Sequence, residues 1–174
     1  MRSIKLIVII LLLLGQACGN GAQKENLEAS AETKEPSGLT PKKIEQLSYT
    51  DYALSTEGEN AVADWQKYQQ LATQISYLKQ GDLSLFNGER EIIMTFVQEL
   101  QESMPEVLNT NPISSRVGVV VTALLKLNDD LILDNIKIQD QLKSIKQLFV
   151  AFANLNFQIN KKLERDLFDS IQPE

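Results

Sequence analysis

The chain has 174 residues, enough for one domain with some additional sequence, and its 43% hydrophobic and 23% charged residues are typical of a globular protein. It contains no histidine, the residue that most often serves as a general base near neutral pH and as a ligand of transition metals. Its net charge of −6 opposes binding to nucleic acid. We therefore expect no catalytic residue, no metal, no cofactor and no nucleic-acid partner.

The beginning of the chain has the pattern of an export signal. Arg2 and Lys5 form a short basic region, residues 6–14 are an unbroken apolar run, and residues 15–17 supply the small side chains that precede cleavage. The apolar run is too short to cross a bilayer core of about 30 Å, which takes about 20 residues as a helix. The sequence therefore predicts a cleaved leader at residues 1–17.

Followed by Cys18, the only cysteine, this leader resembles that of a bacterial lipoprotein precursor. The resemblance implies that the Cys18 thiol carries a lipid such as palmitate. It also implies attachment to the outer membrane of the cell envelope, since Gly19 replaces the aspartate of inner-membrane lipoproteins, and it leaves the side of the membrane open. Gly15 stands where the family usually has a larger aliphatic residue, and it also suits an ordinary secretory signal. Without the two basic residues of the leader the net charge is about −8, so a covalent lipid, rather than charge, would hold the chain at anionic lipids.

The segment after the cysteine is predicted to be a flexible tether. It is rich in Glu, Lys, Ser, Thr and Gly, contains Pro36 and Pro41, and has few large apolar residues. Such a segment cannot bury enough surface to offset its conformational entropy. The expected organisation is a signal peptide at 1–17, the lipidated cysteine and tether at 18–57, and a helical domain at 58–174.

Apolar residues recur every three or four positions in the rest of the chain, which predicts amphipathic helices. The first set, which ends before Gly81, is Ala61, Trp65, Tyr68, Ala72 and Ile75. The second set is Ile92, Ile93, Phe96, Val97, Leu100 and Met104. Asn87 is the expected N-cap of the second helix. The alternative is that Asn87 and Gly88 form a tight hairpin turn, although their flanks lack the alternation of strands.

Asn111 and Pro112 predict the start of a third helix, as its N-cap and its first residue. Its core positions are Val117, Val121, Leu124 and Leu131, with Asn128 in the same frame. A fourth set with coiled-coil spacing is Ile138, Leu142, Ile145, Phe149, Phe152, Ile159 and Leu163.

The third and fourth sets share one frame, so they form either one long helix over residues 114–168 or two helices joined by a turn at Asp134 and Asn135. We favour the turn, because folding back buries more apolar surface in a monomer. The sequence thus predicts an all-α fold, an antiparallel bundle of three or four helices.

Two residue patterns that resemble a catalytic site and a metal site are better explained by structural roles. Ser76 and Lys79 have the spacing in which a lysine activates a serine, but the other elements of the penicillin-recognising enzymes are missing. Asp129, Asp130 and Asp134 gather near the expected turn without the pattern of a calcium-binding loop. We interpret all five as surface or capping residues.

Residues 148–157 are apolar around more than one face of their helix, which is wider than a seam between two helices needs. The helix is then either the centre of the bundle or a surface where Phe149, Phe152 and Asn156 meet a protein partner or a second copy. In the second case Phe152→Asp would change association without unfolding the domain.

The favoured hypothesis for the function of the protein is a non-enzymatic binding or structural module of the envelope. The alternative is a carrier of a lipid or other apolar ligand within the bundle, and an enzyme ranks third.

Overall fold

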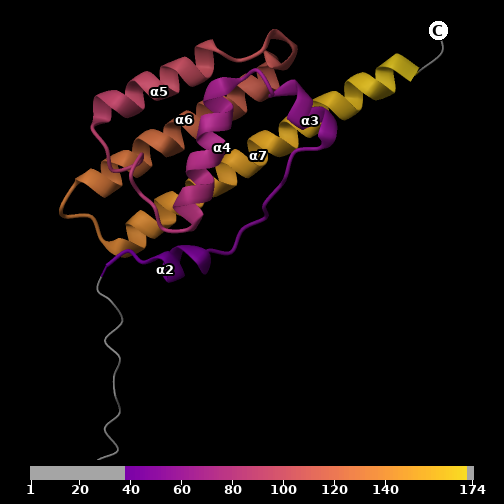
Figure 1. Cartoon of the computed structure of the whole chain (residues 1–174). Coiled ribbons are helices and arrows are strands. Elements are labelled where there is room, and N and C mark those ends of the chain that lie inside the picture. The colour runs from indigo at the N-terminus through magenta and orange to yellow at the C-terminus, as the bar shows by residue number, and fades with distance from the viewer. Residues whose placement is uncertain (1–37, 172–174) are drawn as a thin grey trace, which may run out of the picture. The chain divides into compact units, whose positions relative to one another are not determined.

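The computed structural model describes residues 38–171, and within them it contains α-helices, one short 3-10 helix and no β-strand (Figure 1). The elements are α2 (Pro41–Glu45), α3 (Thr56–Ala61), α4 (Gln66–Lys79), α5 (Arg90–Glu102), the 3-10 helix η1 (Glu106–Leu108), α6 (Asn111–Ile132) and α7 (Ile138–Ile171). The helices pack as a bundle, which confirms the predicted all-α fold. The predicted leader, Cys18 and the first part of the predicted tether lie outside the described residues.

The central hairpin of the bundle is formed by α6 and α7. Residues 133–137 join the two helices, so the chain turns where Asp134 and Asn135 predicted it, and the single long helix is wrong. No other pair of helices in the described region packs together as extensively. The hairpin forms because both helices carry a continuous apolar face, with Val117, Leu124 and Ile145 almost completely buried between them and their neighbours.

The α4 helix begins later than its apolar pattern predicts. The chain turns at residues 62–64, so Ala61 belongs to α3, while Trp65 is the N-cap of α4. Trp65 is fully buried, and its indole N–H donates to the carbonyl oxygen of Leu100 at 3.0 Å. That carbonyl lies in the last turn of α5, where helix carbonyls lack a partner within the helix. Gly81, at φ 91°, ends α4 as predicted.

The loop between α4 and α5 is held by Asn128 of α6. Asn128 is fully buried, and its Nδ2 donates to the carbonyl oxygens of Phe86 and Gly88, both at 2.9 Å. Glu89, rather than the predicted Asn87, is the N-cap of α5. The alternative hairpin at Asn87 is also absent, because the described region has no strand and Phe86 anchors the loop in the core. Long-range packing here overrides the local turn signal.

Residues 38–57 pack on the bundle and so differ from the flexible tether expected for them. Ile44 of α2 is buried, and Leu47, Tyr49 and Leu54 pack against the core. Residues 47–55, which we call the covering segment, are extended and run beside α7 (Figure 1). Helical periodicity misses such a segment, because its apolar side chains find their partners on a helix about a hundred residues away in sequence.

Candidate functional site

The three residues predicted to form an interface are covered by the chain itself. The exposed fractions of Phe149, Phe152 and Asn156 are 2%, 8% and 6%. Tyr49 of the covering segment packs on Phe149, and Tyr68 of α4 stacks on Phe152, each with ring centroids 5.3 Å apart. This part of α7 therefore lies inside the bundle, which is the first of the two alternatives that the sequence left open.

Two asparagines of α7 hold the covering segment by its backbone. Asn156 donates to the carbonyl oxygen of Tyr52 at 2.9 Å, and its own side-chain oxygen accepts the hydroxyl of Tyr68 at 2.7 Å. One helical turn later, Asn160 donates to the carbonyl oxygen of Ala53 at 2.8 Å and accepts the backbone N–H of Ser55 at 2.9 Å. An extended segment without a strand partner needs such side-chain hydrogen bonds to satisfy its backbone.

The Ser-x-x-Lys pattern does not form a reactive pair. Lys79 donates to Asp51 of the covering segment at 2.7 Å, and Ser76 is exposed. Partial burial acts to lower the pKa of Lys79, but hydrogen bonds with Asp51 and Tyr49 outweigh it and raise the pKa above its usual value. The lysine stays protonated at neutral pH and cannot take a proton from the serine.

The aspartates near the α6–α7 turn are divided among different partners. Asp129 pairs with Arg90 of α5, while Asp130 accepts hydrogen bonds from Lys126 at 2.7 Å and from Ser144 of α7. Asp134 is exposed in the turn. Within residues 38–171, no group of acidic, cysteine or histidine side chains is placed to hold a metal ion. Asp129 and Asp130 therefore join α6 to α5 and α7, whereas the sequence predicted surface or capping residues.

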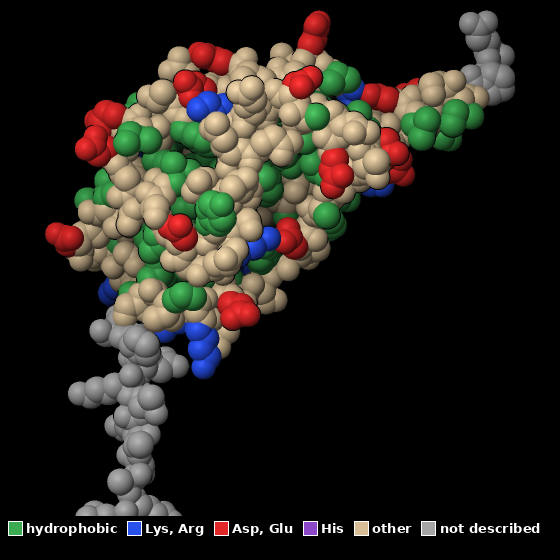
Figure 2. All heavy atoms as spheres, in the orientation of Figure 1, with side chains coloured by type: hydrophobic (Ala, Val, Ile, Leu, Met, Phe, Trp, Pro, Cys, Tyr) green, Lys and Arg blue, Asp and Glu red, His purple; other side chains and the backbone are tan. Residues whose placement is uncertain are grey.

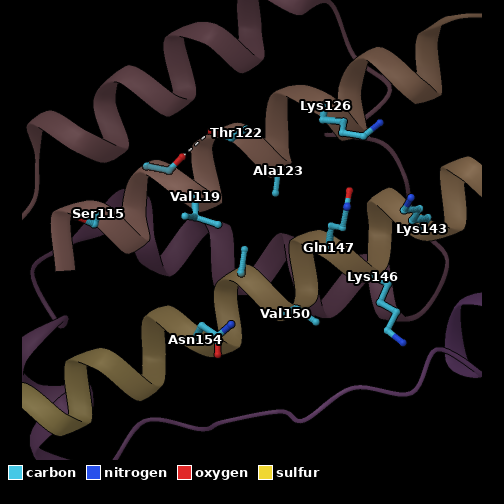
Figure 3. A pocket seen from close by; sticks show the side chains of 12 residues that line it. Ser115, Val119, Thr122, Ala123, Lys126, Lys143, Lys146, Gln147, Val150 and Asn154 are labelled. Atoms are coloured by element: carbon cyan, nitrogen blue, oxygen red, sulfur yellow. Dashed lines mark hydrogen bonds between the residues drawn. The ribbon is translucent and has the colours of Figure 1, made fainter. Parts of the chain in front are cut away.

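An open groove, which we call the α6–α7 groove, runs along the α6–α7 hairpin (Figure 3). Its volume is about 680 Å³, within the range of pockets that hold ligands. The middle of the groove is lined by small or branched apolar residues, namely Gly118, Val119, Ala123, Val150 and Ala151. Val119 and Val150 are 50% and 37% exposed, so the described chain leaves this apolar surface uncovered.

Gly118 lies on this surface at a position where the described structure has room for a side chain. A Cβ atom added to it would meet nothing within 4 Å. Glycine inside a helix costs about 1 kcal/mol relative to alanine, and nothing in the described chain requires that cost. The absence of a side chain keeps the groove open, so that a docked backbone can approach α6 closely.

The two ends of the groove differ in charge. Lys126, Lys143 and Lys146 lie at one end, whereas Ser115 and Asn154 lie at the other (Figure 3). Lys126 is paired with an aspartate of its own helix, but no ion pair or hydrogen bond engages Lys143 or Lys146 within the described part of the chain. The groove is therefore an apolar channel with a basic end on an otherwise acidic protein.

Sequence reasoning missed the groove, because its residues look like the polar face of each helix. The signal that could have found it is spacing: Val119 and Ala123 are four residues apart on one face of α6, and Val150 and Asn154 are four residues apart on α7. Small residues carry little weight in an apolar pattern. Only the antiparallel pairing brings the two faces together.

No protein-family model matches the chain, no curated protein matches its sequence, and no solved structure matches its fold. Within residues 38–171, no helix combines the length and apolar character that are needed to cross a bilayer. The functional conclusion consequently depends on the geometry of the groove and on the residues of the leader.

Proposed function

We propose that this chain is a membrane-anchored lipoprotein of the bacterial cell envelope, and that its helical bundle is a non-enzymatic binding module. The anchor is supported by the lipobox-like leader that ends at Cys18, and Gly19 favours the outer membrane. The binding function is carried by one observation, the uncovered α6–α7 groove. We propose that this groove receives a helix of a protein partner.

The shape and chemistry of the groove favour a helix as its occupant. An amphipathic helix binds by placing its apolar face in such a channel between two helices. Gly118 and Ala151 allow its backbone to come close, while Val119 and Val150 supply the apolar contact. The lysine end suits acidic side chains or the negative carboxyl-terminal end of a docked helix.

The binding proposal can be tested by photo-crosslinking in the bacterium that makes the protein. A photoreactive amino acid replaces Val119 in the full chain, and a matched control replaces Val107, which is 52% exposed in η1 and lies outside the groove. A discrete protein adduct is expected from position 119 alone, and Gly118→Leu, whose Cβ atom would meet nothing within 4 Å and whose side chain would occupy groove space, should abolish it. Equal labelling from both positions contradicts the proposal.

The anchor has a separate test. Cells that express the wild-type chain or the Cys18→Ser variant are grown with radioactive palmitate, and the purified proteins are compared. Label on the wild type alone supports a lipid on Cys18. An unlabelled wild-type protein leaves an ordinary secretory signal as the explanation of the leader.

A carrier of an apolar ligand is the second candidate function, because one observation favours it. Three lysines at the end of an apolar groove also fit an amphiphile with an anionic head group, with Lys143 and Lys146 beside the head. Native mass spectrometry of the purified protein separates the two functions. A carrier retains the mass of a small ligand, whereas a helix-binding module does not.

A further inference from the structure

We infer that the helix received by the α6–α7 groove is the end of α7 from a second copy of this chain. The inference rests on the proposed function, since it names the partner of the same groove. We call residues 161–171 the α7 tip. Each copy inserts its own tip into the groove of the other copy and receives the tip of the other copy in its own groove. The product is a closed dimer.

The α7 tip is an amphipathic helix that is exposed from Glu164 onward, while Lys162 and Leu163 are half-buried against the bundle. It extends past the other helices, and hydrophobic side chains gather on it (Figures 1 and 2). Leu167, Phe168 and Ile171 are 59%, 59% and 69% exposed. Single exposed apolar residues are ordinary, but three large ones within two turns of one helix form a patch that typically contacts another molecule. The chain thus displays both an uncovered apolar groove and an uncovered apolar helix.

The groove is long enough to hold the exposed part of the tip. At about 1.5 Å per residue, the groove from Ser115 to Lys126 is about 16 Å long, and the exposed turns from Glu164 to Ile171 are about 11 Å long. These turns therefore fit within the groove. The small residues of the floor, Gly118 among them, leave room for the bulky Phe168 of a second copy.

Charge sets the direction in which the tip lies. The carboxyl-terminal end of α7 has the negative pole of the helix dipole and carries Asp166 and Asp169, so it favours the end of the groove with Lys143 and Lys146. Among residues 38–171, the two aspartates pair with residues of their own helix, with Lys162 at 2.5 Å and Arg165 at 3.7 Å, and both aspartates are exposed. Such pairs contribute little and do not prevent the aspartates from approaching the lysines of another copy.

This direction makes the two α7 helices antiparallel, which is how a twofold axis perpendicular to them relates two copies. Each tip then lies in the groove of the other copy, and the interface closes without leaving a free groove. The axis crosses α7 midway between groove and tip, near Phe157, which is 39% exposed. The same surfaces used head to tail without closure would instead produce chains of molecules.

The mass of the full-length protein, purified in detergent, tests this inference by light scattering and analytical ultracentrifugation. The expected protein mass is twice that of one mature chain, which is below the 19.5 kDa of the full sequence because the proposed leader at residues 1–17 is cleaved. The double variant Leu167→Ser/Ile171→Ser and the single variant Gly118→Leu should each raise the dimer dissociation constant about tenfold or more. Ile92→Ser, at a 54% exposed residue of α5 outside the groove, is the matched control and should not change it. Circular dichroism checks that each variant keeps its helices.

Crosslinking separates failure of the inference from failure of the proposed function. A photoreactive residue at position 119 should give an adduct of two chains whose second partner maps to residues 161–171. An adduct with a different protein overturns the inference and leaves the proposed helix-binding function in place. A wild-type monomer that gives no protein adduct, or that retains a non-covalently bound amphiphile in addition to the lipid proposed on Cys18, overturns both.

Discussion

Gly58 and Asn160 are in such close contact that a Cβ atom added to the glycine would lie 2.8 Å from Oδ1 of the asparagine. That oxygen accepts the backbone N–H of Ser55, so it is one of the contacts that hold the covering segment on α7. We expect Gly58→Ala to lower the free energy of unfolding by about 1–2 kcal/mol, because the asparagine must move and lose this hydrogen bond. Urea unfolding measures the change.

Gly118→Ala is the matched control, because the same substitution in α6 meets open space. Here alanine should raise the free energy of unfolding by about 1 kcal/mol through its higher helix propensity. The two glycines thus predict effects of opposite sign. A loss of stability at both positions would show that α6 is packed differently from the structure.

Asn128→Asp should lower stability in a pH-dependent manner. The asparagine amide donates to two carbonyl oxygens in the core, and an aspartate would instead direct a negative charge at them. A buried charge without a partner costs several kcal/mol, so we expect a loss of about 3 kcal/mol or more at pH 7. The loss should be smaller in acid, where the protonated carboxyl can donate to one carbonyl. Urea unfolding at the two pH values measures it, and a loss independent of pH contradicts the assignment.

Asp130 should make the α6–α7 turn sensitive to acid. Burial acts to raise the pKa of Asp130, but hydrogen bonds from Lys126 and Ser144 outweigh it and lower the pKa below the ordinary value of 3.8. Because the unfolded chain holds the proton more tightly, this contribution to stability is complete above about pH 4 and is lost as the pH falls through the lower, folded pKa. Asp130→Asn should therefore flatten the acid limb of the curve of stability against pH. Asp134→Asn, at an exposed residue of the turn, should leave that limb unchanged.

Phe152→Asp should unfold the domain, in contrast to the sequence-based expectation that it would only disturb association. The side chain is 8% exposed and stacks on Tyr68, so the variant removes an aromatic contact and buries a charge. A loss of at least about 3–5 kcal/mol is expected from the missing ring alone. Phe168→Asp, at a 59% exposed residue, should leave the circular dichroism spectrum and the folding of the monomer unchanged.

The helices of the bundle were predictable because each one repeats its apolar residues at helical spacing. Phe149, Ile145 and Leu124 were assigned to the core in this way, and all three are buried. The α6–α7 turn was also predictable, because burial of two apolar faces favours folding back even though the frame continues through Asp134. The helix boundaries were less predictable, since the start of α5 depends on contacts from Asn128 rather than on a local cap.

The candidate site was not predictable, for two physical reasons. The sequence left the aromatic face of α7 as either the centre of the bundle or an interface, because nothing in the local pattern shows that Tyr49 comes back to cover Phe149. The groove looked like a solvated surface, because Gly118 and Ala151 contribute little to any hydrophobic pattern. Both features depend on which residues distant in sequence become neighbours, and that information is spread over the whole chain.

The covering segment also determines how the domain responds to a pulling force. Whatever lies before residue 38 connects to the bundle through α2 and this segment, so tension from that side strains the hydrogen bonds of Asn156 and Asn160 before it reaches the helical hairpin. These bonds can break one after another, because they are spaced along a single helix. Loss of these bonds would expose Phe149 and the rest of the aromatic face while α6 and α7 stay paired. A mechanical load applied at the amino-terminal side would therefore expose the hydrophobic aromatic face of α7 before it unfolds the core.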